Sequence, residues 1–257
     1  MPATARVSVQ GRTGTVDSTA DTSKLRRVET ARREIQRRII QLEMSPGETF
    51  TEGDLASSLG MSKTPVREAL NLLSADGYVA VAPRIGYRVA PVTLRDVQDL
   101  FELRELLEAE ATALAARRRL SPEDVATLKK LAESRSADDI DAFLADNTAF
   151  HTHIARCSGN GMLAQMVEHV LLQHERLFRL TSRLSERSED MVHEHHDLIE
   201  TLIAGDEKAA RACVLEQLDQ AQEMVFHALM SSESILDARI VVSEPMRLTF
   251  AKPHSGP

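Results

Sequence analysis

The 257-residue chain has no tryptophan, only two cysteines and 4% aromatic residues. Cys157 and Cys213 are too few and too far apart for a disulfide framework or a cysteine-pair metal motif, so the simple inference is a reducing compartment. No run of about 20 apolar residues is present, which excludes a membrane-spanning helix. The N-terminus also lacks the apolar segment of a secretion signal. These absences together predict a cytoplasmic protein that has no membrane partner.

What the chain does contain is typical of helical proteins. Hydrophobic residues make up 42% of it and charged residues 27%, and long stretches are rich in alanine, leucine, glutamate and arginine. The length allows one small and one medium domain, each with its own core. The net charge of −8 is unevenly divided, because residues 1–92 hold 13 basic and 10 acidic side chains whereas residues 93–257 hold 18 and 29. This asymmetry is typical of a protein with a basic DNA-binding domain and an acidic regulatory domain.

Hydrophobic periodicity divides the chain into four parts. They are a disordered tail (1–23), a DNA-binding domain (24–91), an all-helical domain (92–231) and a proline-containing C-terminal extension (232–257). Helices are predicted over 24–44, from Thr93, from Ser121, and over 136–157, 160–183, 186–204 and 206–231. The helix that begins at Thr93 is expected to bury Val97, Leu100, Leu103, Leu107 and Leu114. The predicted fold is therefore mainly α, a winged helix-turn-helix followed by an antiparallel bundle of about six helices.

Residues 51–73 predict two short helices joined by a tight turn. Thr51 can cap the first helix, and Ser62 can cap the second. Gly60 lies where the chain must turn sharply, which favours a residue that tolerates positive φ. Pro65 falls in the first turn of the second helix, where its missing N–H costs little.

The second helix of this unit has an apolar and a polar face. Val66, Ala69, Leu70 and Leu73 follow a 3.6-residue period and should face inward. The outward side chains are Lys63, Thr64, Arg67 and Asn71. A recognition helix contacts bases and phosphates with its N-terminal residues, so a Lys-Thr-x-x-Arg edge suits duplex DNA. A merely solvated face is the alternative, but the preceding turn and the following hairpin favour DNA.

A small two-stranded hairpin is predicted after Gly77. Residues 78–81 and 87–90 would be its strands, joined by residues 83–86. Arg84 and Gly86 at the tip could approach a DNA groove or phosphate. The alternative is a solvated arginine, as at many hairpin tips.

This part of the chain resembles the winged helix-turn-helix of GntR-type bacterial transcription regulators. The matching segments are Ser-Pro-Gly-Glu at 45–48, Leu-Ala-Ser-Ser-Leu-Gly at 55–60 and Ser-Lys-Thr-Pro-Val-Arg-Glu-Ala-Leu at 62–70. The resemblance implies that Lys63, Thr64, Arg67 and the wing around Gly86 contact the operator. The family usually has arginine in place of Lys63, and lysine lacks the planar fork that reads guanine bidentately.

The second half is similar to the C-terminal domain called FCD in the FadR-type subgroup of these regulators. Four segments carry the resemblance: Leu103-Arg104-x-x-Leu107-Glu108, Asn147-x-x-Phe150-His151-x-x-Ile154, Glu194-His195-x-x-Leu198-Ile199 and Ala204-Gly205-Asp206-x-x-Ala209-Ala210. Together they imply a helical domain with an effector pocket.

Many FCD domains hold a divalent metal in that pocket through one Asp and three His. The matching residues here are Asn147, His151, His195 and Gln217. Two imidazoles and two amides are poor ligands for Zn²⁺ or Ni²⁺, so these four residues are weak metal candidates. The alternative is that they are hydrogen-bonding walls of an effector pocket.

Arg104 matches an arginine that often meets an acidic effector in this subgroup, since guanidinium pairs bidentately with carboxylate. The competing interpretation is an intrahelical ion pair with Glu108. Arg176 and Arg179 are further candidates for the effector. The other histidines are expected to be ordinary surface or core residues: His153, His169, His174, His193, His196 and His227.

These features predict a homodimeric, effector-responsive transcription regulator that reads a short palindrome in double-stranded DNA. The protein is expected to repress a catabolic operon until a small carboxylate metabolite releases it from DNA. The alternative is a transcription activator. A metal-dependent hydrolase built on His151 and His195 is a third hypothesis, and a DNA-binding architectural protein is a fourth.

Overall fold

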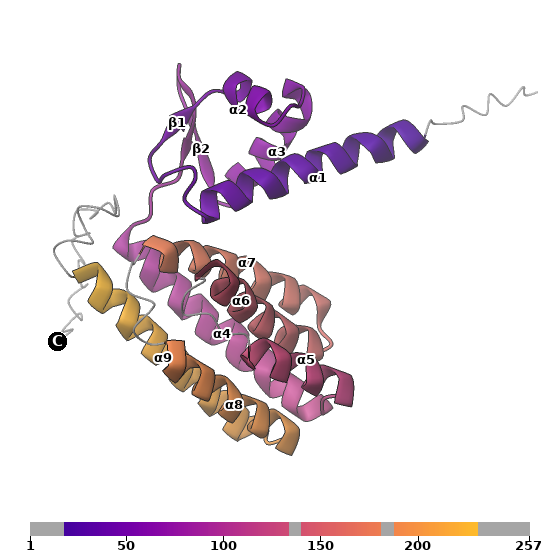
Figure 1. Cartoon of the computed structure of the whole chain (residues 1–257), viewed down its shortest axis with the longest axis vertical. Coiled ribbons are helices and arrows are strands. Elements are labelled where there is room, and N and C mark those ends of the chain that lie inside the picture. The colour runs from indigo at the N-terminus through magenta and orange to yellow at the C-terminus, as the bar shows by residue number, and fades with distance from the viewer. Residues whose placement is uncertain (1–17, 134–139, 181–187, 231–257) are drawn as a thin grey trace, which may run out of the picture.

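The computed structural model describes residues 18–133, 140–180 and 188–230. In it a small N-terminal domain sits on one side of a helical bundle (Figure 1). The predicted tail up to residue 17 and the predicted C-terminal extension lie outside the described residues.

The N-terminal domain packs three helices against a small antiparallel sheet. Its elements are α1 (Ser18–Ile40), β1 (Thr49–Phe50), α2 (Glu52–Ser58), α3 (Lys63–Ala75), β2 (Val79–Ala82) and β3 (Gly86–Val89). The strand order is β1-β3-β2, with Thr49 opposite Arg88 and Val79 opposite Val89. The predicted hairpin is therefore correct but incomplete. The two-residue strand β1 is too short for alternation to reveal it, and it forms only because β3 offers it a partner.

Helix α1 is displaced from its prediction at both ends. It begins at Ser18, within the segment predicted to be disordered, since a helix can propagate beyond its apolar stripe at little cost. It ends at Ile40, before the predicted stop at Ser45-Pro46, because Leu42 adopts a φ of 59° and turns the chain out of the helix.

The two-helix unit follows the sequence prediction closely. The Asp54 N–H donates to Thr51 Oγ1 at 3.1 Å, which caps α2, and Gly60 has a φ of +62° in the turn. The predicted inner residues of α3 are all fully buried: Val66, Ala69, Leu70 and Leu73. Ser62 occupies the N-cap position of α3, but its side chain makes no capping hydrogen bond, so that part of the prediction was wrong.

Six helices form the described part of the second domain, as predicted. They are α4 (Leu94–Arg118), α5 (Pro122–Glu133), α6 (Ile140–Cys157), α7 (Gly161–Leu180), α8 (Ser188–Ala204) and α9 (Glu207–Met230). Thr93 caps α4 through a capping box with Asp96. Apolar clusters at both ends of the bundle hold the helices together.

The predicted inner face of α4 was right at Val97, which is buried, but wrong at Leu103. Leu103 is 43% exposed, whereas Phe101, Arg104 and Glu108 are buried. An oppositely charged pair can replace apolar residues on an inner face, and leucine counting alone does not detect it.

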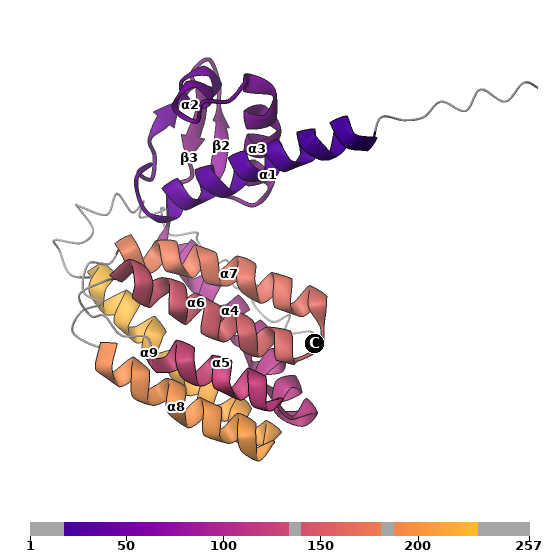
Figure 2. The same ribbon diagram turned by 45° about the vertical axis from the view of Figure 1, so that its right-hand side comes forward.

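Helix α7 is the bundle helix nearest the N-terminal domain in both views (Figures 1 and 2). Gln173 Nε2 donates to the Asp76 carbonyl at 3.2 Å, just after α3. The buried Arg176 guanidinium donates to the carbonyl of Ala90, which follows β3. The carbonyls at the end of α3 and after the wing are therefore both fixed to α7.

Gly86 lies tightly against β1. With a φ of +129°, a Cβ there would come 2.7 Å from the Phe50 carbonyl oxygen, whereas a Cβ at Gly47, with a φ of +79°, would meet no atom within 4 Å. We therefore expect Gly86→Ala to lower the free energy of unfolding by about 3 kcal/mol and Gly47→Ala by only about 1 kcal/mol. Denaturant unfolding of both variants measures this. Equal losses would mean that the contact with β1 does not matter.

Candidate functional site

The predicted DNA-contacting side chains of α3 all lie on the surface. Lys63, Thr64, Arg67 and Asn71 are exposed, on the face opposite the buried residues of the helix. No protein element covers this edge in the described part of the chain, so it is accessible to a DNA duplex.

Arg67 has an intramolecular partner that was not predicted. Its Nε and Nη2 donate to the two carboxylate oxygens of Glu52 at 2.7 and 2.9 Å, although the Arg67 side chain is 62% exposed. This hydrogen bonding lowers the pKa of Glu52. The bidentate pair holds the arginine fork in place at the start of α2, so a DNA partner must compete with a carboxylate.

The wing tip carries an exposed arginine in an uncommon conformation. The Ile85 N–H donates to the Ala82 carbonyl at 3.0 Å and closes a turn in which Arg84 has a φ of 69°. A β-turn with positive φ at its third position normally places glycine there. Such strain is often found at functional positions, and it marks Arg84 more strongly than the sequence did. Gly86 is half-buried, and its contact with β1 alone accounts for a glycine.

A cavity of about 30 Å³ lies inside the helical bundle. All five predicted effector residues line it: Arg104, Asn147, His151, His195 and Gln217. The structure adds His174, Leu218, Gln220, Ala221 and Met224. This volume suffices for a water molecule or a small ion, and a metabolite would need the walls to move.

Arg104, which lines the cavity, belongs to a buried ion pair. Arg104 Nε donates to Glu108 Oε1 at 2.6 Å, and each side chain is only 2% exposed. His151 Nδ1 lies 3.0 Å from the other Glu108 oxygen. Burial alone would raise the pKa of Glu108, but Arg104 and His151 outweigh it and lower the pKa to about 2. The predicted intrahelical pair therefore exists, and Glu108 also orients His151.

The other two histidines of the cavity are held neutral. Burial lowers the pKa of both His174 and His195 well below the usual value, and the charges of Arg104 and His151 add to the effect at His174. His174 was predicted to be an ordinary surface or core histidine; it is buried in the core, and it also lines the cavity. The helical period did contain the signal, because His174 continues the inner stripe of Val167, Val170 and Leu171 on α7.

Several buried polar atoms of the cavity have no hydrogen-bond partner among the described residues. They are Arg104 Nη1, Asn147 Oδ1 and His174 Nε2. Buried polar groups are rarely left unpaired, and each costs about 1–3 kcal/mol in that state. The cavity is therefore prepared for a polar ligand that accepts from a guanidinium.

The cavity does not fit a tightly held divalent metal. Asn147 and Gln217 bring neutral amides in place of charged or imidazole ligands. The carboxylate of Glu108, which contacts His151, is already shared by Arg104 and His151, and the Arg104 charge opposes a dication.

Arg176 and Arg179 do not line the cavity. Arg176 contacts the inter-domain segment at Ala90, and Arg179 pairs with Asp141 and Glu175. They are therefore not part of this cavity. Separately, none of the described helices is both long and apolar enough to cross a membrane.

The chain is similar to known regulators over most of its length. The gntR family of bacterial regulatory proteins matches residues 27–89, and the FCD domain matches residues 99–220. An uncharacterized HTH-type transcriptional regulator in an unstable DNA locus of Streptomyces ambofaciens is 33% identical, over 72% of this chain and 78% of the relative. The transcriptional repressor GlaR of Escherichia coli is 30% identical, over 65% of this chain and 79% of the relative.

Solved structures agree with this assignment. The structure of E. coli McbR/YncC superposes with a TM-score of 0.70 at 27% identity and covers 78% of this chain and 97% of that chain. The hypothesis of a metal-dependent hydrolase has no support among these relatives, which are regulators rather than enzymes. The chain therefore belongs to the GntR family of bacterial regulatory proteins, as a DNA-binding transcription regulator with an FCD effector-binding domain.

Proposed function

We propose that this regulator represses a catabolic operon and leaves its operator when a small carboxylate metabolite enters the cavity of the helical domain. The named repressor GlaR among its relatives supports the direction of control. Such a protein would act in the cytoplasm on double-stranded operator DNA.

The main support for this proposal is that α7 lines the cavity and also contacts the DNA-binding domain. His174 lines the cavity, and the neighbouring Gln173 donates to the carbonyl of Asp76 at the end of α3. Two residues after His174, Arg176 donates to the carbonyl of Ala90 at the end of the wing. A displacement of α7 by a ligand would therefore move the attachment points of the recognition helix and the wing together.

The cavity volume supports a change of conformation on binding. About 30 Å³ holds little more than a water molecule, so a larger effector displaces helices or side chains when it enters. It then binds an expanded arrangement better than the compact one, which is the thermodynamic requirement for allostery. A carboxylate is the favoured class, because Arg104 Nη1 is a buried cationic donor that no described residue accepts from.

Dimerisation is part of the proposal. Leu103 and Leu106 on α4 are exposed, Leu106 to 72%, and a large apolar side chain on a helix surface is often covered by a second subunit. A two-fold dimer would place two α3 helices in successive major grooves and would read a palindrome. Lys63, Thr64, Arg67, Asn71 and Arg84 would make the contacts.

The DNA interface is tested with a pair of substitutions. Arg67→Ala should weaken binding to the operator, recovered by sequencing bound genomic fragments, by roughly 10–100-fold, because it removes one bidentate base contact. Glu52→Gln should instead strengthen binding to unrelated duplexes, since the carboxylate that competes with phosphate is gone. Fluorescence anisotropy at several salt concentrations measures both.

Circular dichroism and size-exclusion chromatography must show both variants folded as the parent. If Arg67→Ala bound the operator as tightly as the parent, α3 would not be the recognition helix.

The effector pocket is tested with the double variant His151→Ala, His195→Ala. A library of mono- and dicarboxylates is first screened by thermal shift, and the best compound is titrated. The double variant should bind DNA normally but bind that compound at least 10–100-fold more weakly, because the loss of even one hydrogen bond to a charged ligand costs about 1.5–3 kcal/mol. Isothermal titration measures the affinity.

Arg176→Met is the matched control outside the cavity. It should keep the affinity for the compound and lose much of its effect on DNA binding, because the link from α7 to Ala90 is removed. Normal responses in the double variant would show that the effector binds elsewhere.

The dimer is tested with Leu106→Arg, which places a charge on the exposed face of α4. We expect a monomer, or a dimer at least tenfold weaker, because burial of an unpaired charge is costly. Analytical ultracentrifugation measures the change, with Met162→Arg on the exposed start of α7 as the control. Loss of the dimer only in the Met162 variant would place the interface on another face.

A further inference from the structure

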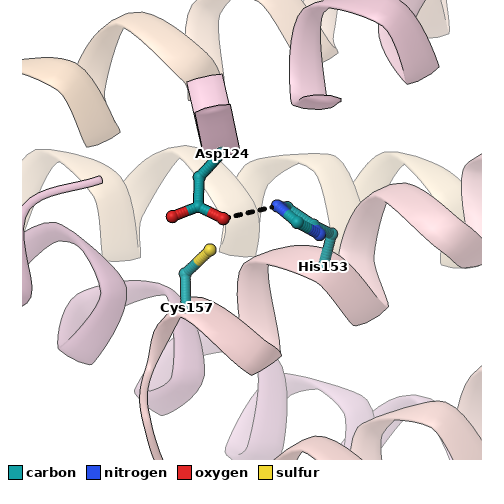
Figure 3. Close-up of side chains that lie close together, drawn as sticks. All are labelled: Asp124, His153 and Cys157. Carbon is teal, nitrogen blue, oxygen red and sulfur yellow. Dashed lines mark hydrogen bonds and ion pairs between the residues drawn. The ribbon is translucent and has the colours of Figure 1, made fainter. Parts of the chain in front are cut away.

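Three potential metal ligands from two helices converge outside the effector cavity. Asp124 lies in the first turn of α5, and His153 and Cys157 lie in the last two turns of α6. The carboxylate, the imidazole and the thiol point toward one another (Figure 3). One ligand atom from each residue lies within 4.8 Å of the others.

This cluster and the cavity use different sides of α6. His153 follows His151 by two residues, which is about 200° around a helix. His151 faces the cavity, whereas His153 faces α5, where its Nε2 lies 3.0 Å from Asp124 Oδ1. The cluster is therefore a separate site.

The Asp124 carboxylate is already oriented by its own helix. Its Oδ2 accepts from the Ser121 hydroxyl at 2.8 Å and from the Ser121 N–H at 3.3 Å. This fixes the carboxylate and leaves Oδ1 directed at His153. Hydrogen bonds that orient a ligand in this way are typical of metal sites.

We propose that Asp124, His153 and Cys157 bind Zn²⁺. Tetrahedral zinc with ligand bonds of about 2.0–2.3 Å keeps its ligand atoms about 3.3–3.7 Å apart. The observed separations, from 3.0 Å up to 4.8 Å, reach this range by small side-chain adjustments. Sulfur, nitrogen and oxygen donors together suit zinc and do not suit Mg²⁺ or Ca²⁺, which prefer oxygen alone.

Charge and exposure agree with this assignment. A thiolate and a carboxylate neutralise the two charges of the ion, and the side chains of His153 and Asp124 are 22% and 35% exposed, so the ion can enter from solvent and water can fill the fourth position. Burial, assisted by the Asp124 charge, raises the pKa of the Cys157 thiol to about 12. Binding therefore exchanges the thiol proton for the metal: a sulfur–metal bond forms, and the proton goes to solvent.

Cobalt substitution tests the site in the full-length protein. After removal of metals with a chelator, Co²⁺ is added and the absorption spectrum is recorded. We expect one ion per chain, a thiolate-to-cobalt charge-transfer band and the d–d bands of tetrahedral coordination, all displaced by Zn²⁺. Cys157→Ser should abolish the charge-transfer band and weaken Co²⁺ binding at least tenfold.

Cys213→Ser is the matched control, because Cys213 is the other cysteine and lies on α9. It should retain the band. Asp124→Asn, in which the amide oxygen can still cap α5, is a second variant that should keep the band but bind Co²⁺ at least tenfold more weakly. The proposal is overturned if the parent shows no charge-transfer band, or if the band survives Cys157→Ser and disappears in Cys213→Ser.

Discussion

The helical domain is organised around the buried ion pair of Arg104 and Glu108. Two charges that are 2% exposed are tolerated only while each compensates the other, and loss of either partner would leave an uncompensated charge in the core. Glu108 also contacts His151 Nδ1. This contact fixes the orientation of the imidazole and does not involve its other ring nitrogen, Nε2. Among the described residues the same pair leaves Arg104 Nη1 without a hydrogen-bond partner, and it engages the carboxylate that contacts His151, one of the matched metal ligands. The proposed preference of the cavity for a carboxylate and its poor fit to a divalent metal therefore both follow from the contact between Arg104 and Glu108.

From this pair, the proposed signal passes through a rigid helix. Helix α7 packs on α4 and α6 and contributes His174 to the cavity, while Gln173 and Arg176 contact the backbone after α3 and after β3. Close-packed helices have few alternative arrangements, so in this proposal a ligand that enlarges a cavity of about 30 Å³ displaces a helix as well as side chains. The buried Arg176, with a pKa that burial lowers to about 10, connects the two domains through its hydrogen bond to Ala90.

The sequence predicted the features that depend on neighbouring residues. It did not predict contacts between segments that are far apart in the chain. The cap at Thr51, the turn at Gly60 and the inner face of α3 all follow from short-range rules, and the structure confirmed them. Strand β1 needs β3, and the pairing of Arg67 with Glu52 needs α2 and α3 to be packed together. Five residues of the cavity were located by resemblance, and the helical period places His174 on the inner face of α7, whereas the contact of Glu108 with His151 requires the packed bundle.

The contact between Arg67 and Glu52 has a consequence for specificity in the proposed complex. Guanine offers two acceptors, O6 and N7, to an arginine fork, in much the same geometry as the two carboxylate oxygens of Glu52. At the correct base, Arg67 exchanges one bidentate partner for another, and the cost of leaving Glu52 is offset. At an incorrect base no second bidentate partner exists, so either the ion pair is lost without compensation or the arginine stays with Glu52 and makes no contact. The carboxylate therefore acts against wrong sites more than against the right one, which increases the difference in affinity on which operator recognition depends.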